Sequence, residues 1–260
     1  MTRSGRGCHP DGMDLDIAPL DGRMGLWEQL SGYWPTFVTN DPTGALYYRH
    51  FAEIWPEFTL LAVDRATGEP VAKAHSVPLS FTGDIGDIGD GLPENGWDWA
   101  IRSAALDHMG SVKPTIVSAL EIMVRPDVRG SGLSGLMLGA MRENAGRLGF
   151  KDLVAPVRPS GKHAQIDKSI DEYAYETRAD GLPIDPWLRV HVRAGGTILN
   201  VAHSSMVVAG SLKQWREWTG LPFDRTGPVV VPEALTAVHC DVEEDHAVYV
   251  EPNVWVHHRI

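Results

Sequence analysis

Gly130 and Gly132 are separated by one residue and follow an apolar stretch that ends near Val124. The segment after them has the apolar spacing of a helix. Because glycine has no side chain, successive backbone N–H groups of such a turn can approach an anion closely. The unpaired N–H groups and the positive end of the following helix dipole also favour phosphate. These residues predict a site for a phosphate-bearing cofactor, with an ordinary strand-to-helix turn as the alternative.

The same stretch resembles a known family. Val124-x-Pro126-x-x-Arg129-Gly130-x-Gly132-x-Ser134 resembles the acyl-CoA-binding motif of the GNAT superfamily of N-acyltransferases, Arg/Gln-x-x-Gly-x-Gly/Ala after a strand with Val-x-Pro. Arg129 and Gly132 fit this motif, whereas Ser134 stands where glycine or alanine is usual. The resemblance implies acetyl-CoA as acyl donor, a small-molecule amine as acceptor and no metal. The residues it implies for binding CoA are Met123, Val124, Arg129, Gly130, Ser131, Gly132, Leu133, Ser134 and Gly135.

A dinucleotide-binding turn is the competing interpretation, because Gly130, Gly132 and Gly135 also spell G-x-G-x-x-G and Arg158 could receive a 2′-phosphate. A dinucleotide strand stays apolar up to its first glycine, whereas Arg-Pro-Asp-Val-Arg intervenes here. No second set of alternating strands and helices follows. CoA is therefore favoured over NADP.

The resemblance also implies catalytic residues. Glu121, three residues before Val124, stands where GNAT relatives often carry a carboxylate near the acetyl group, and it is the candidate base, acting directly or through water. A strand carboxylate satisfied by a neighbouring N–H or arginine is the alternative. The backbone N–H near Val124 is expected to hold the thioester oxygen. We expect direct attack by the amine, without an acyl-enzyme on Cys240.

The family's usual general acid is a tyrosine four residues before a Gly-Phe pair. Here His191 occupies that position before Gly195, and Gly196 replaces the phenylalanine. An imidazole titrates near neutral pH, so His191 is a candidate donor toward the departing thiolate. Tyr173 and Tyr175 on the preceding helical segment are the alternatives. Weak or absent catalysis is the third possibility that this replacement leaves open.

Apolar periodicity predicts the elements that must position these residues. A strand over 117–124, the glycine turn and a helix from Leu133 form the central unit, and the strand 152–157 is expected beside the first in parallel. Further strands are predicted over 13–19, 58–63, 70–78 and 197–208, and further helices up to 30 and over 43–54, 97–105, 169–175, 187–193 and 211–218. The segment 229–260 is predicted to be strand-rich, with a turn inside 249–256.

With the resemblance, these elements predict an α/β (α+β) fold: a mixed, mostly antiparallel GNAT-like sheet flanked by helices, with N-terminal, mid-chain and C-terminal elaborations. We expect a disordered leader at 1–12 and one domain over 13–260, with a core at about 58–210 and a strand-rich extension at 211–260. His75 is interpreted as a packed core histidine and 83–91 as a solvated loop. The aromatic candidates for the acceptor-site wall are Trp34, Tyr47, Tyr48 and Trp55.

Composition limits the remaining function classes. The 260 residues are 43% apolar and 22% charged, which is typical of a soluble globular protein. A net charge of −11 argues against nucleic acid as a partner. No apolar run reaches the length of a membrane span, so we expect a cytoplasmic protein without a membrane partner, with a homodimer as one open form. Three functions stay open: an N-acetyltransferase, a non-catalytic acyl-CoA-binding protein and an NADP-dependent oxidoreductase.

Overall fold

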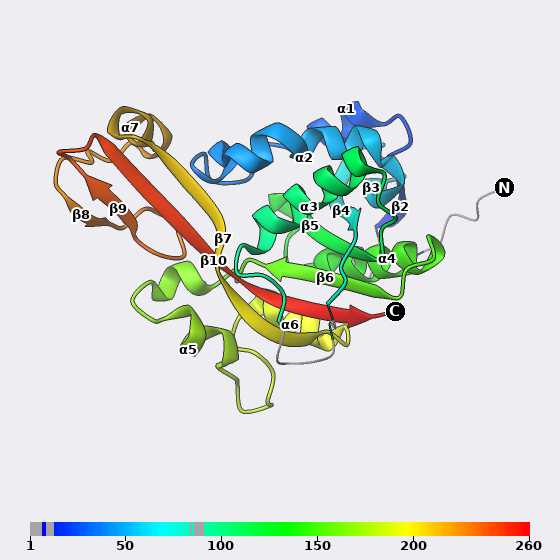
Figure 1. Ribbon diagram of the computed structural model, residues 1–260. Coiled ribbons are helices and arrows are strands. Elements are labelled where there is room, and N and C mark those ends of the chain that lie inside the picture. The colour runs from blue at the N-terminus through cyan, green and yellow to red at the C-terminus, as the bar shows by residue number, and fades with distance from the viewer. Residues whose placement is uncertain (1–6, 9–12, 84, 86–90) are drawn as a thin grey trace.

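One ten-stranded sheet runs through the computed structural model, which describes residues 7–8, 13–83, 85 and 91–260 (Figure 1). Its order is β1-β2-β3-β4-β5-β6-β10-β9-β8, and β7 pairs with β10. The strands are β1 (Gly7–Cys8), β2 (Asp14–Pro19), β3 (Thr59–Asp64), β4 (Pro70–Leu79), β5 (Ile116–Val124), β6 (Asp152–Val157), β7 (Thr197–Ser211), β8 (Gly227–Val229), β9 (Val238–Asp241) and β10 (His246–Arg259). Within the described residues only β5 and β6 pair in parallel. The predicted mixed, mostly antiparallel sheet is confirmed.

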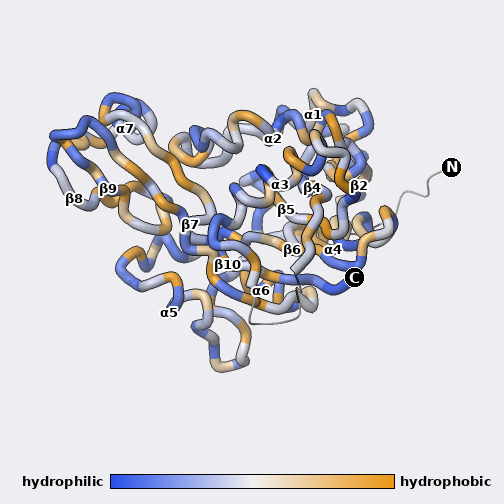
Figure 2. The backbone as a smooth tube through the Cα atoms, viewed as in Figure 1, coloured by the Kyte–Doolittle hydropathy of each residue, from blue (hydrophilic) through white to orange (hydrophobic). Residues whose placement is uncertain are grey.

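Helices cover both faces of this sheet. The α-helices are α1 (Met24–Glu28), α2 (Pro42–Ile54), α3 (Gly96–Gly110), α4 (Leu133–Arg147), α5 (Ile170–Tyr175), α6 (Pro186–Arg193) and α7 (Leu212–Thr219). Short 3₁₀ helices lie at η1 (Val38–Asn40), η2 (Pro56–Phe58), η3 (Pro126–Val128) and η4 (Lys162–Gln165). In Figure 2 hydrophobic and hydrophilic residues alternate along many of these elements, as expected when one face of each is buried.

Alternation along β4 separates the two layers. Ala72 and Ala74 pack in the cluster that contains Met137 of α4, whereas Lys73 and His75 point to the layer of α1 and α2. His75 is fully buried, its Nδ1 lies 2.6 Å from the Thr59 hydroxyl, and burial lowers its pKa to about 3. The interpretation of His75 as a packed core histidine is confirmed.

The chain's C-terminal strand corrects one prediction. β10 lies between β6 and β7, so residues 246–259 form the middle of the sheet instead of an added extension (Figure 1). The turn predicted within 249–256 is also wrong, since β10 continues through it with a register shift between Glu251 and Asn253. A β-bulge accommodates Pro252, which has no N–H to donate to a ladder.

The predicted leader and the Asp/Gly repeat fall mostly outside the described residues. Residues 1–6 and 9–12 are not among them, while Gly7–Cys8 pair with β2 as the short strand β1. Most of 83–91 also lies outside. In the described part of the chain, no helix has the length and apolar character needed to cross a membrane.

Candidate active site

The two parallel strands at the centre of the sheet separate after a short contact. β5 and β6 pair only at Val117 with Leu153 and at Ser118 with Val154. On the other side of β5, the register with β4 shifts by one residue at Leu120, which adds a bulge. β6 continues along β10, while β5 continues along β4 as far as Val124. The second half of β5 therefore has a backbone edge that β6 does not cover, which suits a ligand that lies between the strands.

The glycine turn follows directly at the end of β5. Gly130 and Gly132 have φ values of +84° and +85°, a region that side-chain-bearing residues rarely adopt. Gly132 is the N-cap of α4 and supplies no side chain to cap it, so the first N–H groups of a 15-residue helix are free for a ligand. A Cβ at Gly130 would meet no atom within 4 Å. This open cradle fits the pyrophosphate of CoA.

The neighbouring side chains hold the turn in shape. Arg129 Nε donates to the Val124 carbonyl at 3.2 Å, and Ser131 Oγ donates to the Val128 carbonyl at 2.7 Å. Leu133 is buried and anchors the first turn of α4 in the core. Arg129 thus ties the turn to the end of β5, a role that the motif's arginine can have without touching a phosphate.

Alanine at Gly130 is expected to raise the KM for acetyl-CoA about tenfold, because an added methyl group takes up space in the open turn and keeps phosphate from the backbone N–H groups. Gly149→Ala is the matched control, since Gly149 has a φ of +95° and equally open surroundings beyond the other end of α4. Both variants should lose about 1–2 kcal/mol of stability from left-handed strain. Steady-state kinetics that show equal KM values for the two variants would contradict the assignment.

Glu121 lies on the half of β5 that does not pair with β6, and three donors surround its carboxylate. Its Oε1 accepts the indole N–H of Trp34, and its Oε2 accepts the hydroxyl of Tyr48 and lies 3.0 Å from Nζ of Lys73. The Glu121 side chain is only 4% exposed. A carboxylate held in this way is fixed in direction and is a candidate to anchor or deprotonate a nitrogen.

Lys73 is the partner that the sequence analysis missed. It is 3% exposed, pairs with Glu121, and lies with its Nζ 4.2 Å from the centre of the Trp27 ring. The available signal was a single lysine, the one Lys, Arg, Asp or Glu residue within the mostly apolar strand Pro70–Leu79. A lysine in a buried strand needs a charged partner.

The predicted aromatic wall divides into two pairs. Trp34 and Tyr48 reach Glu121, as described above, whereas Tyr47 stacks on Phe51 and Trp55 packs against Phe51 and His108. Burial and the Glu121 carboxylate raise the pKa of Tyr48 well above its ordinary value. Tyr48 is therefore a neutral donor that holds Glu121, and only two of the four aromatic candidates belong to the site.

Three further carboxylates are buried on β10, at the N-cap of α2 and in α3. Glu251 on β10 pairs with Arg158 at 2.9 Å, and the Arg158 guanidinium lies 6.0 Å from the centre of the Trp34 ring. Asp41 caps α2 and Asp98 lies in the first turn of α3, both almost fully buried. Burial and the charge of Asp41 raise the pKa of Asp98 to about 7. Glu251 and Asp98 are thus each paired with an arginine, Asp98 with Arg102 at 2.8 Å.

Comparisons with known proteins agree with this geometry. No family model matches the chain. It is 29% identical over 284 aligned residues to the arginine N-acetyltransferase avaD of Aspergillus versicolor, covering 96% of this chain and 95% of the relative. Its structure resembles the loading GNATL domain of CurA from Lyngbya majuscula, with a TM-score of 0.56, 15% identity and coverage of 94% and 97% of the two chains.

The chain has the fold of GNAT proteins, and its similarity to an N-acetyltransferase supports the predicted resemblance to the GNAT superfamily. A second solved structure of the fold, the GphF GNAT-like decarboxylase in complex with isobutyryl-CoA, matches with a TM-score of 0.54 and 15% identity over 94% of this chain and 98% of that one. The relative in Aspergillus versicolor also confirms the predicted class of enzyme, an acyl-CoA-dependent N-acetyltransferase. A non-catalytic acyl-CoA-binding protein is therefore not the preferred function.

The structure disfavours the predicted general acids. His191 is 2% exposed and its Nδ1 lies 2.9 Å from Nε2 of His258, so burial lowers the pKa of His191 to about 3. A histidine that is neutral at pH 7 and bonded to another histidine is a poor proton donor. Tyr173 donates to buried Asp185, and the Tyr175 hydroxyl donates to the Leu199 carbonyl. None of these three bonds leads to Glu121.

The dinucleotide alternative is also corrected. Arg158, the residue considered for a 2′-phosphate, is committed to Glu251 and to the carbonyl of Glu233. A doubly wound dinucleotide fold needs a mostly parallel sheet, and this sheet is mostly antiparallel. Gly130, Gly132 and Gly135 are therefore not part of a doubly wound dinucleotide fold, and the role of this turn in binding CoA stays a prediction.

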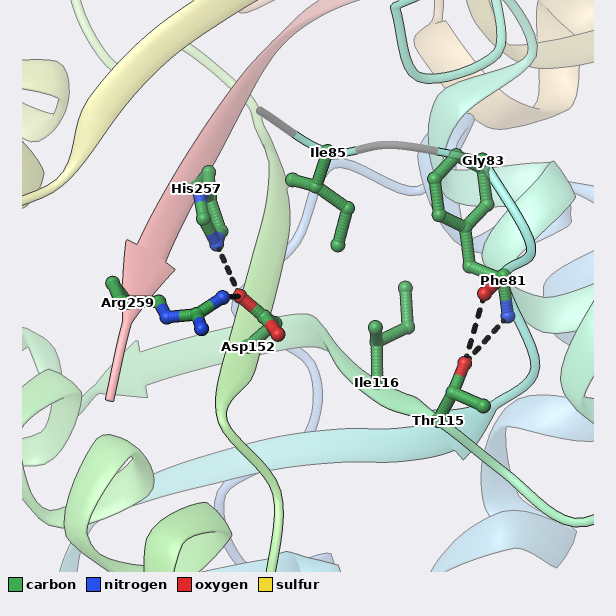
Figure 3. A pocket seen from close by; sticks show the side chains of 8 residues that line it. All are labelled: Phe81, Gly83, Ile85, Thr115, Ile116, Asp152, His257 and Arg259. Atoms are coloured by element: carbon green, nitrogen blue, oxygen red, sulfur yellow. Dashed lines mark hydrogen bonds and ion pairs between the residues drawn. The ribbon is translucent and has the colours of Figure 1, made fainter. Parts of the chain in front are cut away.

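One open cavity lies away from this site. It has a volume of about 310 Å³ and lies where β5 and β6 begin, at the opposite end of β5 from the glycine turn (Figure 3). His257 and Arg259 both point to the Asp152 carboxylate there, at 2.9 and 2.8 Å. Because these charged groups satisfy one another, the cavity offers no group that the acetyl transfer requires.

Proposed function

We propose that this protein transfers the acetyl group of acetyl-CoA to a nitrogen of arginine or of a related small molecule that carries a guanidinium group. The observation that carries the proposal is Glu121, a buried carboxylate fixed beside the uncovered edge of β5. The relative in Aspergillus versicolor is an arginine N-acetyltransferase, which supports the choice of acceptor. The net charge of −11 also favours a cationic acceptor.

The reaction follows from these positions. The acceptor nitrogen attacks the carbonyl carbon of the thioester, the C–N bond forms, the C–S bond breaks, and the sulfur leaves as the CoA thiolate. Glu121 receives the proton that the nitrogen must lose, directly or through one water. Backbone N–H groups on the uncovered half of β5 polarise the thioester oxygen.

Direct attack is preferred to an acyl-enzyme because the chain's buried cysteine is badly placed for one. Cys240 lies on β9, in the cluster that contains Trp215 and Tyr249, and burial raises the pKa of its thiol. A thiol with a raised pKa is a weak nucleophile at neutral pH. Mass spectrometry after incubation with acetyl-CoA alone should therefore find Cys240 unmodified.

An acceptor panel tests the proposed function. CoA release is measured with L-arginine, agmatine, Nα-acetylarginine, putrescine and tryptamine, and mass spectrometry of the products locates the acetyl group. Turnover should be highest for acceptors with a guanidinium group. In parallel, acetyl-CoA should raise the midpoint of thermal unfolding and NADPH should not. Turnover of tryptamine or putrescine ahead of every guanidinium compound would contradict the assigned acceptor class.

A further inference from the structure

The bonding capacity of Glu121 shows where an acceptor must approach. Oε2 already accepts from Tyr48 and Lys73, which together use its two lone pairs. Oε1 accepts from the indole N–H of Trp34. Oε1 therefore has one lone pair to spare. Because the Glu121 side chain is only 4% exposed, we expect an acceptor nitrogen to approach Oε1 from the side of the partly exposed indole of Trp34.

Among the three donors, Trp34 is the one that is able to move away. Lys73 is on a central strand and Tyr48 is in the middle of α2, and both are surrounded by packed rings. Trp34 lies in the irregular segment between α1 and η1 and is 36% exposed. The neighbouring Tyr33 is 40% exposed, and Gly32 at φ +87° has open space around it.

We propose that Trp34 is the gate of the acceptor site. Its indole N–H occupies Glu121 Oε1 in the absence of acceptor, and the acceptor nitrogen displaces it to reach the carboxylate. The displaced indole stays beside the site, where its face is available to stack on a guanidinium group. This inference rests on the proposed function, because it assigns the acceptor nitrogen to Glu121.

Trp34→Phe tests the gate, since phenylalanine keeps an aromatic face and lacks the N–H that closes it. Acceptor binding no longer has to break the bond to Glu121, so the KM for L-arginine should fall about threefold to tenfold with little change in kcat. Trp34→Ala should lose this gain, because it also removes the stacking face. Tyr33→Phe, on the exposed neighbour, is the matched control and should keep wild-type constants.

Fluorescence gives a second, non-kinetic readout. L-arginine added to the CoA-bound wild type should change tryptophan emission as the indole leaves the carboxylate, and the change should be absent in Trp34→Phe. A KM for arginine that rises in Trp34→Phe would overturn the gate, because the N–H would then belong to the acceptor-bound state. An unchanged KM with an unchanged fluorescence response would overturn it as well.

Failure of the proposed function has a different signature. If the wild type acetylates another amine of the panel instead of arginine, the acceptor assignment is wrong. The gate is then tested by comparing the KM values of the wild type and Trp34→Phe for that amine. If no amine is acetylated, the proposed function and the gate are both rejected. Turnover of arginine without any effect of Trp34→Phe rejects the gate alone.

Discussion

Replacement of Glu121 by glutamine is expected to lower kcat/KM for the acceptor about 100- to 1,000-fold, the range typical for removal of a positioned base. Glutamine keeps the size of the side chain and its one oxygen can still accept from either Trp34 or Tyr48, but it cannot take a proton from the attacking nitrogen. The KM for acetyl-CoA should change little, because the glycine turn lies beyond the end of β5.

Stability is the confounding effect in that experiment. Lys73 is buried beside Glu121, and a buried charge left without its partner costs about 3–5 kcal/mol. A partly unfolded Glu121→Gln protein would lose activity for that reason alone. The single variant therefore cannot separate catalysis from folding.

A double variant separates the two effects. Lys73→Met combined with Glu121→Gln removes both charges and should recover most of the lost free energy of unfolding. Activity should not recover with it, since no carboxylate is restored. Lys73→Met alone should be less stable than the wild type and retain the catalytic carboxylate. Recovery of kcat/KM in the double variant would show that Glu121 acts only through the fold.

The central unit of this protein was predictable because its signals are local. The strand, the two glycines and the helix from Leu133 follow one another in the sequence, and each has its own cue in periodicity or in missing side chains. The capping residues Ser169 and Ser211 are local signals too, and both caps are present. For such elements the contacts that decide the structure lie within a few residues.

The surroundings of Glu121 were not predictable in the same way. Its donors come from a loop, a helix and a strand that are separated by 87, 73 and 48 positions from it along the chain. No periodicity links such positions, and hydrophobic patterning treats Lys73 as an anomaly within a strand. The place of β10 between β6 and β7 is similar, because strand order depends on pairing between distant segments.

His191 shows how a residue can match a motif position and still face a different environment. His191 lies in the last turn of α6, which ends shortly before Gly195 as predicted. However, β10 brings His258 against the His191 ring. That neighbour comes from the last strand of the chain, which the sequence analysis placed in an extension. The sequence analysis therefore had no signal for the contact between the two imidazoles.

Acidification is expected to destabilise this protein steeply below pH 6.5. Burial lowers the pKa of His75 and His191 to about 3 and that of His258 to about 4. In the unfolded chain the histidines have a pKa near 6.5. Between pH 6.5 and the lowered pKa values of the folded state, the unfolded chain binds more protons, so the free energy of unfolding decreases as the pH falls. At pH 5 each histidine should contribute a loss of about 2 kcal/mol relative to pH 7.

Asp98 acts in the opposite direction and supplies the control. Its pKa is raised to about 7, so its folded carboxyl gains a proton before the unfolded one does, and stability increases as the pH falls from 7 toward 4. Asp98→Asn removes that gain and should make the acid loss steeper, whereas His258→Gln should make it shallower. Urea unfolding at pH 5, 6, 7 and 8 measures all three slopes. If the wild type is equally stable at pH 5 and pH 7, Asp98 and Asp41 must offset the three buried histidines. Asp98→Asn should then lose stability between pH 7 and pH 5, and a variant that does not would contradict the prediction.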